Sequence, residues 1–388
     1  MRICLVYDCL FPHTVGGAER WYRSLAERLA ADGHEVTYLT LRQWDRGTDP
    51  GVPGVEVRVV GPRMHLYSAP GRRRILPPVV FGAGVLWHLL RHGGRYDVVH
   101  TCSFPYFSLL AAALARLRWR YRLVVDWFEV WSREYWREYL GTLGGDAGWL
   151  VQRLCARLPQ RAFCFSRLYA ARLRDEGLRG EVTMLAGVYS GSLERRQIRP
   201  AEPLIVFAGR HIPEKQVPAI LPALRHARAR IPDLRASILG DGPERDEVLR
   251  LVGELGLDDA VDVPGFVASD TVDEEIARAL CLLLPSRREG YGLVVIEAAA
   301  AGTPSVVVAG SDNAAVELIA EGENGFVAPS AAPEDLAAAI LRVNDAGPAL
   351  RASTAAWFDR HAARLSLAAS LEIALDAYGH PVRLSARS

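Results

Sequence analysis

The chain has 388 residues, half of them hydrophobic, and a formal net charge of +1. This length exceeds one ordinary core and predicts two domains, while the composition excludes a disordered chain and a protein built for bulk binding of nucleic acid. No run of 18 apolar residues occurs, and none of the six cysteines has CxxC spacing. With the opening RICLVYD resembling a strand and no signal peptide, these features favour a cytoplasmic protein with reduced, buried thiols.

Short apolar runs alternate with helical patterns along the whole chain. Several runs are continuous in Val, Ile and Leu, which is typical of parallel strands buried on both faces, and the first helix is expected at 19–33. Repeated βα units predict an α/β fold with two doubly wound parallel sheets. The expected strands are 3–8, 36–41, 55–60, 97–101, 122–127, 162–166, 182–185, 204–209, 236–240, 281–285, 305–308 and 325–328.

The segment 190–203 carries Gly, Ser, Pro and charge without periodicity, which is typical of a linker. We therefore expect an amino-terminal Rossmann-like domain over 1–195 and a second one over 196–355. Residues 356–388 are expected to form a helix that packs back on the first domain, followed by a tail. Ligands of such sheets bind at the carboxyl ends of the strands, so two of them facing a cleft would enclose two substrates.

The stretch PSRREGYGLVVIEAAAAGTP (285–304) places a glycine-rich loop between a strand and a helix. Gly290 and Gly292 allow backbone amides to approach a ligand, and they lead into a helix amino-terminus that suits phosphate oxygens. Glu289 on the loop and Glu297 on the helix would suit the hydroxyls of a sugar or ribose. The alternative is an exposed loop acid and an acid that interacts with the helix dipole.

A second cation-rich loop, FAGRHIPEK, follows the strand at 204–209. Only one of the 46 basic residues is a lysine, Lys215, so the other 45 are arginines. A lysine kept in such a chain indicates a need for a compact ammonium rather than a planar guanidinium. With Arg210 it would neutralise a diphosphate leaving group. The alternative for either side chain is a surface ion pair.

The matching turn of the first domain is FPHTVGGAERW (11–21), with Gly16 and Gly17 opening a helix. The alternative is a flexible connection. The chain has no GxxxxGK[ST], no GxSxG, no Asp-x-Asp pair and no histidine spacing typical of a metal site.

Together these motifs resemble those of retaining glycosyltransferases of the GT-B fold, family 4. The match is nearly continuous over about 200–340 and patchier in the first half. It rests on EGYGLVVIE (289–297), GR-x4-K (209–215), GDGP (240–243), PGFV (264–267), ELIAEGENGFVAP (317–329) and GGAE (16–19).

The resemblance implies roles for individual residues. Arg210 and Lys215 would hold the donor diphosphate, Glu289 would contact the transferred sugar, and Glu297 would bind the ribose. The family works without a metal, keeps the anomeric configuration and uses the leaving phosphate as proton acceptor. Backbone or side-chain contacts to the donor would come from Gly17, Phe266, Val267, Gly290, Tyr291, Gly292 and Leu293.

Two departures from the family pattern concern the acceptor side and the domain junction. Where relatives carry a histidine after the fifth strand, we align Phe128 in VVDWFEVW. Asp126 or Glu129 would substitute for it, or His100 or His13 would point into the cleft. The usual Asn-Gly-Val-Asp at the domain junction is Ala-Gly-Val-Tyr here (186–189).

The sequence therefore predicts a transfer of a hexose from a nucleotide-diphosphate sugar to an acceptor hydroxyl, in cell-envelope, polysaccharide or glycolipid assembly. No cofactor or metal is expected. The acceptor is a glycan, glycolipid or small molecule, and nucleic acid is not a partner. Arginines at 151–180 and the apolar segment 75–90 leave an anionic membrane surface as a further candidate partner, at the cytoplasmic face. The alternatives are a natural-product glycosyltransferase, a sugar-nucleotide-binding protein without transferase activity, and a GT-B epimerase; a phosphorylase-like enzyme is a weaker one.

Overall fold

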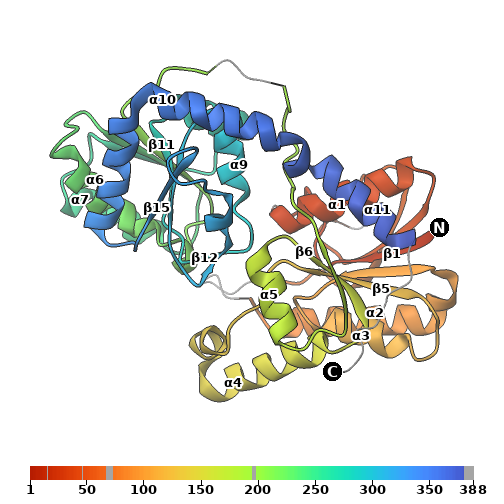
Figure 1. Ribbon diagram of the computed structural model, residues 1–388. Coiled ribbons are helices and arrows are strands. Elements are labelled where there is room, and N and C mark those ends of the chain that lie inside the picture. The colour runs from red at the N-terminus through yellow and green to blue at the C-terminus, as the bar shows by residue number, and fades with distance from the viewer. Residues whose placement is uncertain (15, 46, 67–72, 195–197, 380–388) are drawn as a thin grey trace. The chain divides into compact units, whose positions relative to one another are not determined.

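The computed structural model describes residues 1–14, 16–45, 47–66, 73–194 and 198–379 (Figure 1). Internal contacts divide the chain into two units. Unit 1 holds the described residues up to Val188 together with those from Ala368 onward, and unit 2 holds those between Tyr189 and Leu367. The chain thus leaves unit 1 after Val188 and returns to it after Leu367. We had expected the first domain to end at residue 195 and the returning segment to begin at residue 356.

Unit 1 is built on a seven-stranded sheet in the order β3-β2-β1-β4-β5-β6-β7, and every neighbouring pair is parallel. Apart from Arg2, every residue of β1, β4 and β6 is buried, as expected for a sheet covered on both faces. The strands are β1 (Arg2–Val6), β2 (Glu35–Leu41), β3 (Val55–Gly61), β4 (Val98–Cys102), β5 (Arg122–Trp127), β6 (Gln160–Cys164) and β7 (Gly180–Met184).

The helices of unit 1 include one from the far end of the sequence. That helix, α11 (Leu367–Gly379), places the ring of Tyr378 completely inside unit 1. The residues 356–365, which we expected in this returning helix, belong instead to the last helix of unit 2. The remaining helices are α1 (Gly17–Ala31), α2 (Leu76–His92), η1 (Gly93–Arg95), α3 (Phe107–Ala115), α4 (Arg133–Ala156) and α5 (Arg167–Asp175).

Unit 2 has a six-stranded parallel sheet in the order β10-β9-β8-β11-β13-β15 and a separate parallel pair, β12 with β14. Sequence periodicity missed β10 because its strand VDVPG alternates in burial and contains Pro264. The strands are β8 (Leu204–Ala208), β9 (Arg235–Leu239), β10 (Val261–Gly265), β11 (Cys281–Leu284), β12 (Arg288–Glu289), β13 (Ser305–Val308), β14 (Asp312–Asn313) and β15 (Gly325–Ala328).

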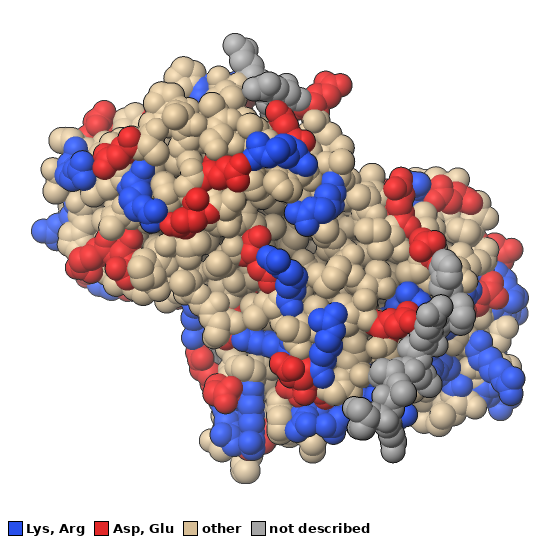
Figure 2. Space-filling model, in the orientation of Figure 1, with Lys and Arg blue, Asp and Glu red and all other residues tan. Residues whose placement is uncertain are grey.

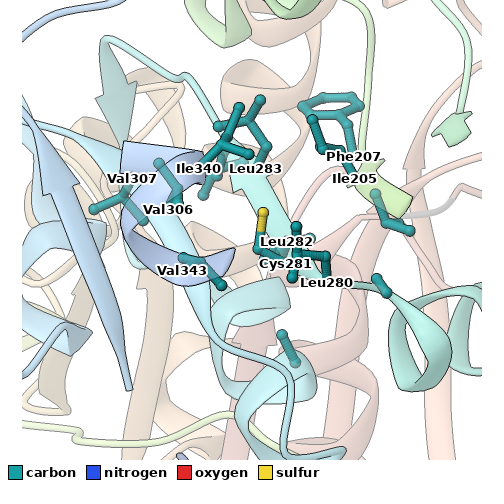
Figure 3. Packing of buried hydrophobic residues seen from close by; sticks show 14 of the residues in the cluster. Ile205, Phe207, Leu280, Cys281, Leu282, Leu283, Val306, Val307, Ile340 and Val343 are labelled. Atoms are coloured by element: carbon teal, nitrogen blue, oxygen red, sulfur yellow. The ribbon is translucent and has the colours of Figure 1, made fainter. Parts of the chain in front are cut away.

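The core of unit 2 forms where the sheet meets the long helix α10 (Pro333–Leu365). Ile340 and Val343 of α10 lie near the buried side chains of β11 and β13, and Phe207 of β8 lies in the same cluster (Figure 3). Residue Gly347, at φ 57°, kinks α10. The other helices are η2 (Pro213–Lys215), η3 (Val217–Ala219), α6 (Ile220–Arg228), α7 (Arg245–Glu254), α8 (Ser269–Arg278), α9 (Leu293–Ala300) and η4 (Ala314–Leu318).

Candidate active site

The loop after β8 carries Arg210 and Lys215 and is held by a neighbouring turn rich in glycine. A Cβ at Gly240, where φ is 118°, would lie 1.9 Å from the Gly209 carbonyl oxygen, and one at Gly242 would lie 2.4 Å from that of His211. His211 N–H donates to the Asp241 carbonyl at 2.8 Å. The GDG turn therefore supports the FAGRHIPEK loop through backbone contact that only glycine permits.

Lys215 lies on η2, and its ammonium pairs with the carboxylate of Glu289 on β12. The two residues are 74 positions apart in the chain, and both side chains are largely buried. The Ser286 hydroxyl donates to the same carboxylate at 2.8 Å. A carboxylate held by an ammonium and a hydroxyl is fixed in position and keeps lone pairs for a ligand hydroxyl.

The backbone under Glu289 is fixed by Asn313 of β14. Its side-chain amide donates to the carbonyls of Ser286 at 2.9 Å and Val308 at 2.8 Å, and its side-chain oxygen accepts from Ala315 N–H at 3.0 Å. Asn313 is buried, so these bonds are protected from water. Neither Ser286 nor Asn313 was anticipated, although Ser286 stands only three residues before Glu289.

A second ion pair joins the same two segments with the opposite polarity. The Arg288 guanidinium of β12 lies 4.0 Å from the carboxylate of Glu214 on η2, next to the pair of Lys215 and Glu289. Arg287 N–H also donates to the Glu214 carbonyl at 3.0 Å. We call these four side chains, Glu214, Lys215, Arg288 and Glu289, the ion-pair clasp, because they join the FAGRHIPEK loop to β12.

The glycine loop after β12 leads directly into α9, as the sequence predicts. Gly292 is the residue that precedes the helix, with φ 96°, and a Cβ there would lie 2.7 Å from that of Ala315. No side chain caps this helix end. Val295 N–H donates to the Gly292 carbonyl at 2.9 Å, and the amides of Leu293 and Val294 before it are offered to an external acceptor, which suits an anion. Burial raises the pKa of the Tyr291 phenol, and Gly290, Leu293 and Glu297 are half-buried on the same loop and helix.

The remaining donor-side candidates lie at the surface. Arg210 is exposed, and its guanidinium makes no hydrogen bond or ion pair with the part of the chain that the structure describes. Phe266, which follows β10, is 76% exposed, and Val267 beside it is half-buried. An exposed aromatic ring at the carboxyl end of a strand suits the face of a nucleobase. Gly17 is exposed at the first position of α1 in unit 1.

Two of the acceptor-side candidates, His100 and Asp126, have no exposed surface. His100 Nε2 lies 3.0 Å from Asp126 Oδ1, and His100 Nδ1 lies 2.5 Å from the hydroxyl of Tyr378 on α11. Trp21 Nε1 donates to the second oxygen of Asp126 at 2.8 Å. The expectation that His100 points into a cleft is therefore wrong for this structure, because His100 joins α11 to the interior of unit 1. Asp126, expected to substitute for the family histidine, is buried beside it.

Phe128 and Glu129 lie at the end of β5 and are half-buried. The ring of Phe128 stacks on Phe165 with centroids 4.7 Å apart, while the Glu129 carboxylate accepts from Trp131 Nε1 at 2.8 Å. Both remain candidates for the acceptor side. The other alternative, His13, is exposed and tilts against Trp44 at 5.0 Å.

A polar pair that the sequence did not suggest lies at the carboxyl end of β1. Asp8 is completely buried and pairs with the guanidinium of Arg73, which also lies over the ring of Phe104. Arg73 N–H donates to the Tyr139 hydroxyl at 3.0 Å. This edge of the sheet therefore holds fixed charge and aromatic surface, the chemistry that a polar acceptor with an apolar part requires.

Burial favours the neutral forms of two side chains close to these loops. Burial lowers the pKa of His211, and burial raises the pKa of Glu244. Among the described residues, no three His, Cys, Asp or Glu side chains are grouped as a metal site. The expectation of a reaction without metal or cofactor stays a prediction.

Sequence comparison places this architecture among known proteins. The description "Glycosyl transferase 4-like domain" matches residues 16–187, and "Glycosyl transferases group 1" matches residues 192–354. A D-inositol 3-phosphate glycosyltransferase of a Nocardioides species is 30% identical over 370 residues, covering 85% of this chain and 78% of that protein. The chain belongs to the group 1 glycosyltransferase family.

Other known proteins are similar over shorter stretches or in fold alone. An exopolysaccharide phosphotransferase of Streptomyces coelicolor is 39% identical over 143 residues, but the match spans 36% of this chain and 14% of that longer protein. Sucrose-phosphate synthase of Thermosynechococcus elongatus superimposes with a TM-score of 0.78 over 97% of this chain and 98% of its own, at 18% identity. Anabaena HepE in complex with UDP superimposes with a TM-score of 0.74 over 98% of this chain and 100% of its own, also at 18% identity. These two solved structures confirm the GT-B fold.

Proposed function

We propose that this protein is a retaining glycosyltransferase that moves a hexose from a nucleotide-diphosphate sugar to an acceptor hydroxyl. The observation that carries the proposal is the pairing of Lys215 with Glu289 beside the uncapped amino-terminus of α9. One side chain offers a compact positive charge, the other offers hydroxyl acceptors, and the helix end offers amides. A sugar diphosphate has the three complementary groups.

The reaction breaks the bond between the anomeric carbon and the diphosphate oxygen. Lys215 and Arg210 stabilise the negative charge that develops on the departing diphosphate, together with the amides of α9. Glu289 orients the hexose through its hydroxyls, and Glu297 binds the ribose. The acceptor oxygen bonds to the anomeric carbon from the same face, and its proton passes to the leaving phosphate oxygen, so no metal or cofactor takes part.

Binding must first rearrange the ion-pair clasp. In the structure, the charge of Lys215 is balanced by Glu289. A diphosphate carries more negative charge than one carboxylate and can draw the ammonium toward itself. Glu289 is then released to accept hydrogen bonds from the sugar. The pair thus keeps both buried charges compensated until the donor supplies their partners.

We infer that the acceptor comes from the cell envelope, a polysaccharide or a glycolipid, and that transfer takes place at the cytoplasmic face of a membrane. A natural product is the alternative acceptor. The similarity to a D-inositol 3-phosphate glycosyltransferase and to part of an exopolysaccharide phosphotransferase supports a polyhydroxylated or phosphorylated acceptor. The UDP in HepE makes UDP-hexoses the first donors to screen.

The donor is tested by a thermal-shift screen with UDP-, GDP- and ADP-hexoses. A ligand that binds only the folded protein raises its unfolding temperature by mass action. We expect one nucleotide class to raise it, and Lys215→Ala to abolish that rise. Arg230→Ala is the matched control, because it removes an exposed ion pair with Asp345 from the same unit and should keep the rise. No rise with any nucleotide sugar would refute the donor assignment.

Phe128 gives one specific reason to consider a sugar-nucleotide-binding protein without transferase activity. Its apolar ring stands where the family pattern has a histidine, and it stacks on Phe165. A transfer assay on wild type and Phe128→His separates the two functions. We expect wild type to transfer, with the product keeping the anomeric configuration in NMR spectra. An inert wild type and an active Phe128→His would establish the alternative.

A further inference from the structure

The outward face of α2 is apolar from Leu76 to Leu90. Its exposed side chains recur at helical spacing and are apolar until Arg91 in the last turn, whereas the opposite face is buried in unit 1. A surface helix of a water-soluble domain normally turns charged or polar residues outward. The exposed stripe consists of Leu76, Val79, Ala83, Trp87 and Leu90, and Trp87 is 62% exposed.

Two glycines fix which side of α2 faces outward. A Cβ at Gly82 would lie 2.9 Å from the Phe107 carbonyl oxygen of α3, and one at Gly84 would lie 1.9 Å from the Val60 carbonyl oxygen of β3. Such approaches are open only to glycine, so α2 is seated closely on both neighbours. The stripe therefore cannot turn inward without unpacking the helix.

The neighbouring helix α3 extends the same surface. It packs against α2, and its exposed residues Phe107 and Leu114 are apolar, as is Leu117 in the segment that follows. Leu117 is 85% exposed. Trp119 Nε1 donates to the Leu90 carbonyl at 3.2 Å and so joins the end of α2 to this segment. We call the stripe of α2 with these three side chains the α2–α3 face. Apolar patches of this kind on a surface indicate a binding partner.

The segment that forms the α2–α3 face is strongly basic. Residues 72–122 contain nine arginines and a single acid, Asp97, which pairs with Arg2. Arginines 91, 95, 118 and 120 are exposed near the carboxyl ends of both helices. By contrast, acids and arginines are interspersed over the side of unit 2 that Figure 2 shows. An apolar face with a basic border suits a surface that is apolar inside and negatively charged outside.

We propose that the α2–α3 face binds the surface of an anionic lipid bilayer, with Trp87 and Leu117 entering the headgroup region. A second copy of the chain fits less well, since a symmetric interface would bring the basic border against itself. None of the described helices is long and apolar enough to cross a membrane. α2 therefore lies along the bilayer, with Trp87 at the depth where indole is favoured and arginines facing phosphates.

The other basic region of the sequence, 151–180, is less uniform in charge. Arg153 pairs with Glu176 at 3.2 Å and lies over Trp149, and Arg161 is buried and pairs with Glu181 at 2.9 Å. Four further arginines there, 157, 167, 174 and 179, are exposed, and so is the acid Asp175. We assign the membrane contact to α2 and α3 because residues 73–122 have no exposed acid, and this assignment stands independently of the donor assignment.

Sedimentation of the full chain with vesicles tests the proposal. We expect wild type to pellet with vesicles of phosphatidylcholine and phosphatidylglycerol in equal parts, and not with phosphatidylcholine alone. Trp87→Glu and Leu117→Glu should each reduce the bound fraction by at least about fivefold, since a charge in the bilayer is costly. Their unfolding temperatures and their donor-induced rise should match wild type, which separates this test from that of the donor.

Leu143→Glu is the matched control, because Leu143 on α4 is 88% exposed and lies outside the face. It should bind vesicles as wild type does. A loss equal to that of Leu117→Glu would overturn the assignment to α2 and α3. So would a wild type that ignores both kinds of vesicle, or one that sediments as a dimer which Trp87→Glu converts to a monomer.

Discussion

The ammonium of Lys215 is largely buried and lies beside a carboxylate. It pairs with Glu289, whose carboxylate also accepts from Ser286. The next residue, Gln216, has φ 49° and is the one described non-glycine residue in the left-handed region. Strained backbone of this kind costs on the order of 1 kcal/mol and is found at functional sites. The turn therefore holds Lys215 in one orientation against Glu289.

Lys215→Arg tests whether the site requires a compact ammonium. A guanidinium keeps the charge but is planar and larger than the ammonium that pairs with Glu289. We expect donor affinity to fall by about tenfold or more, a loss of about 1.4 kcal/mol, measured by calorimetric titration. Arg210→Lys, at an exposed position, should cost less. Equal affinity of Lys215→Arg and wild type would remove the reason for a lysine at this position.

Some residues of the site could be predicted from the sequence and others could not. Lys215 stands out by composition, and Glu289 by its place before a glycine loop. Asn313 and Ser286 act through backbone carbonyls and a neighbouring side chain, which depend on a fold contact between distant segments. His100 and Asp126 were proposed because Phe128 stands where the family pattern has a histidine. Their partners, which are each other, Tyr378 and Trp21, depend on the packing of distant segments.

At the scale of elements, the ion-pair clasp joins η2 to β12. Glu214 and Lys215 of one face Arg288 and Glu289 of the other, so charges alternate along both segments. Lys215 and Glu289 would touch the donor, while Glu214 and Arg288 would position them. Sequence periodicity could not predict the two-residue strand β12 or its partner β14, since neither is long enough to show a pattern.

A charge exchange tests the positioning role. Glu214→Arg and Arg288→Glu should each lower kcat by about tenfold, because each leaves a largely buried charge facing a like charge. The double variant Glu214→Arg with Arg288→Glu restores an opposite pair and should recover most of kcat in a transfer assay. KM for the donor should change less than kcat. A double variant no better than the singles would mean that the pair does not position the loops.

At the scale of the whole molecule, unit 1 is completed by the last described helix of the chain. Tyr378 on α11 is buried beside His100 and Phe163, and burial raises the pKa of its phenol. The alternation of βα units predicted both sheets because it depends on local patterns. The point of return could not be predicted, since α10 and α11 have continuous helical periodicity and only contacts distinguish the unit that each covers.

Substitutions at Tyr378 measure how firmly α11 is seated. Tyr378→Phe leaves His100 Nδ1 without its hydroxyl partner and should lower the free energy of unfolding by about 1–2 kcal/mol. Tyr378→Ala also opens a cavity and should cost about 3–5 kcal/mol. Denaturant unfolding followed by circular dichroism gives both values. The donor-induced thermal rise, which belongs to unit 2, should persist in Tyr378→Phe. Equal stability of all three proteins would show that α11 is only loosely attached.

The two segments at which the chain passes between the units are hydrogen-bonded to each other. Tyr189 N–H donates to the Leu365 carbonyl at 3.2 Å, and Leu367 N–H donates to the Tyr189 carbonyl at 2.8 Å. Unit 2 is therefore an insertion whose two ends meet. During synthesis, its whole sequence leaves the ribosome before the helix that completes unit 1 does. Unit 2 can fold while unit 1 still lacks α11. During that interval the apolar site that Tyr378 will fill in unit 1 is exposed. A chaperone would then have a defined site to cover on the nascent first unit.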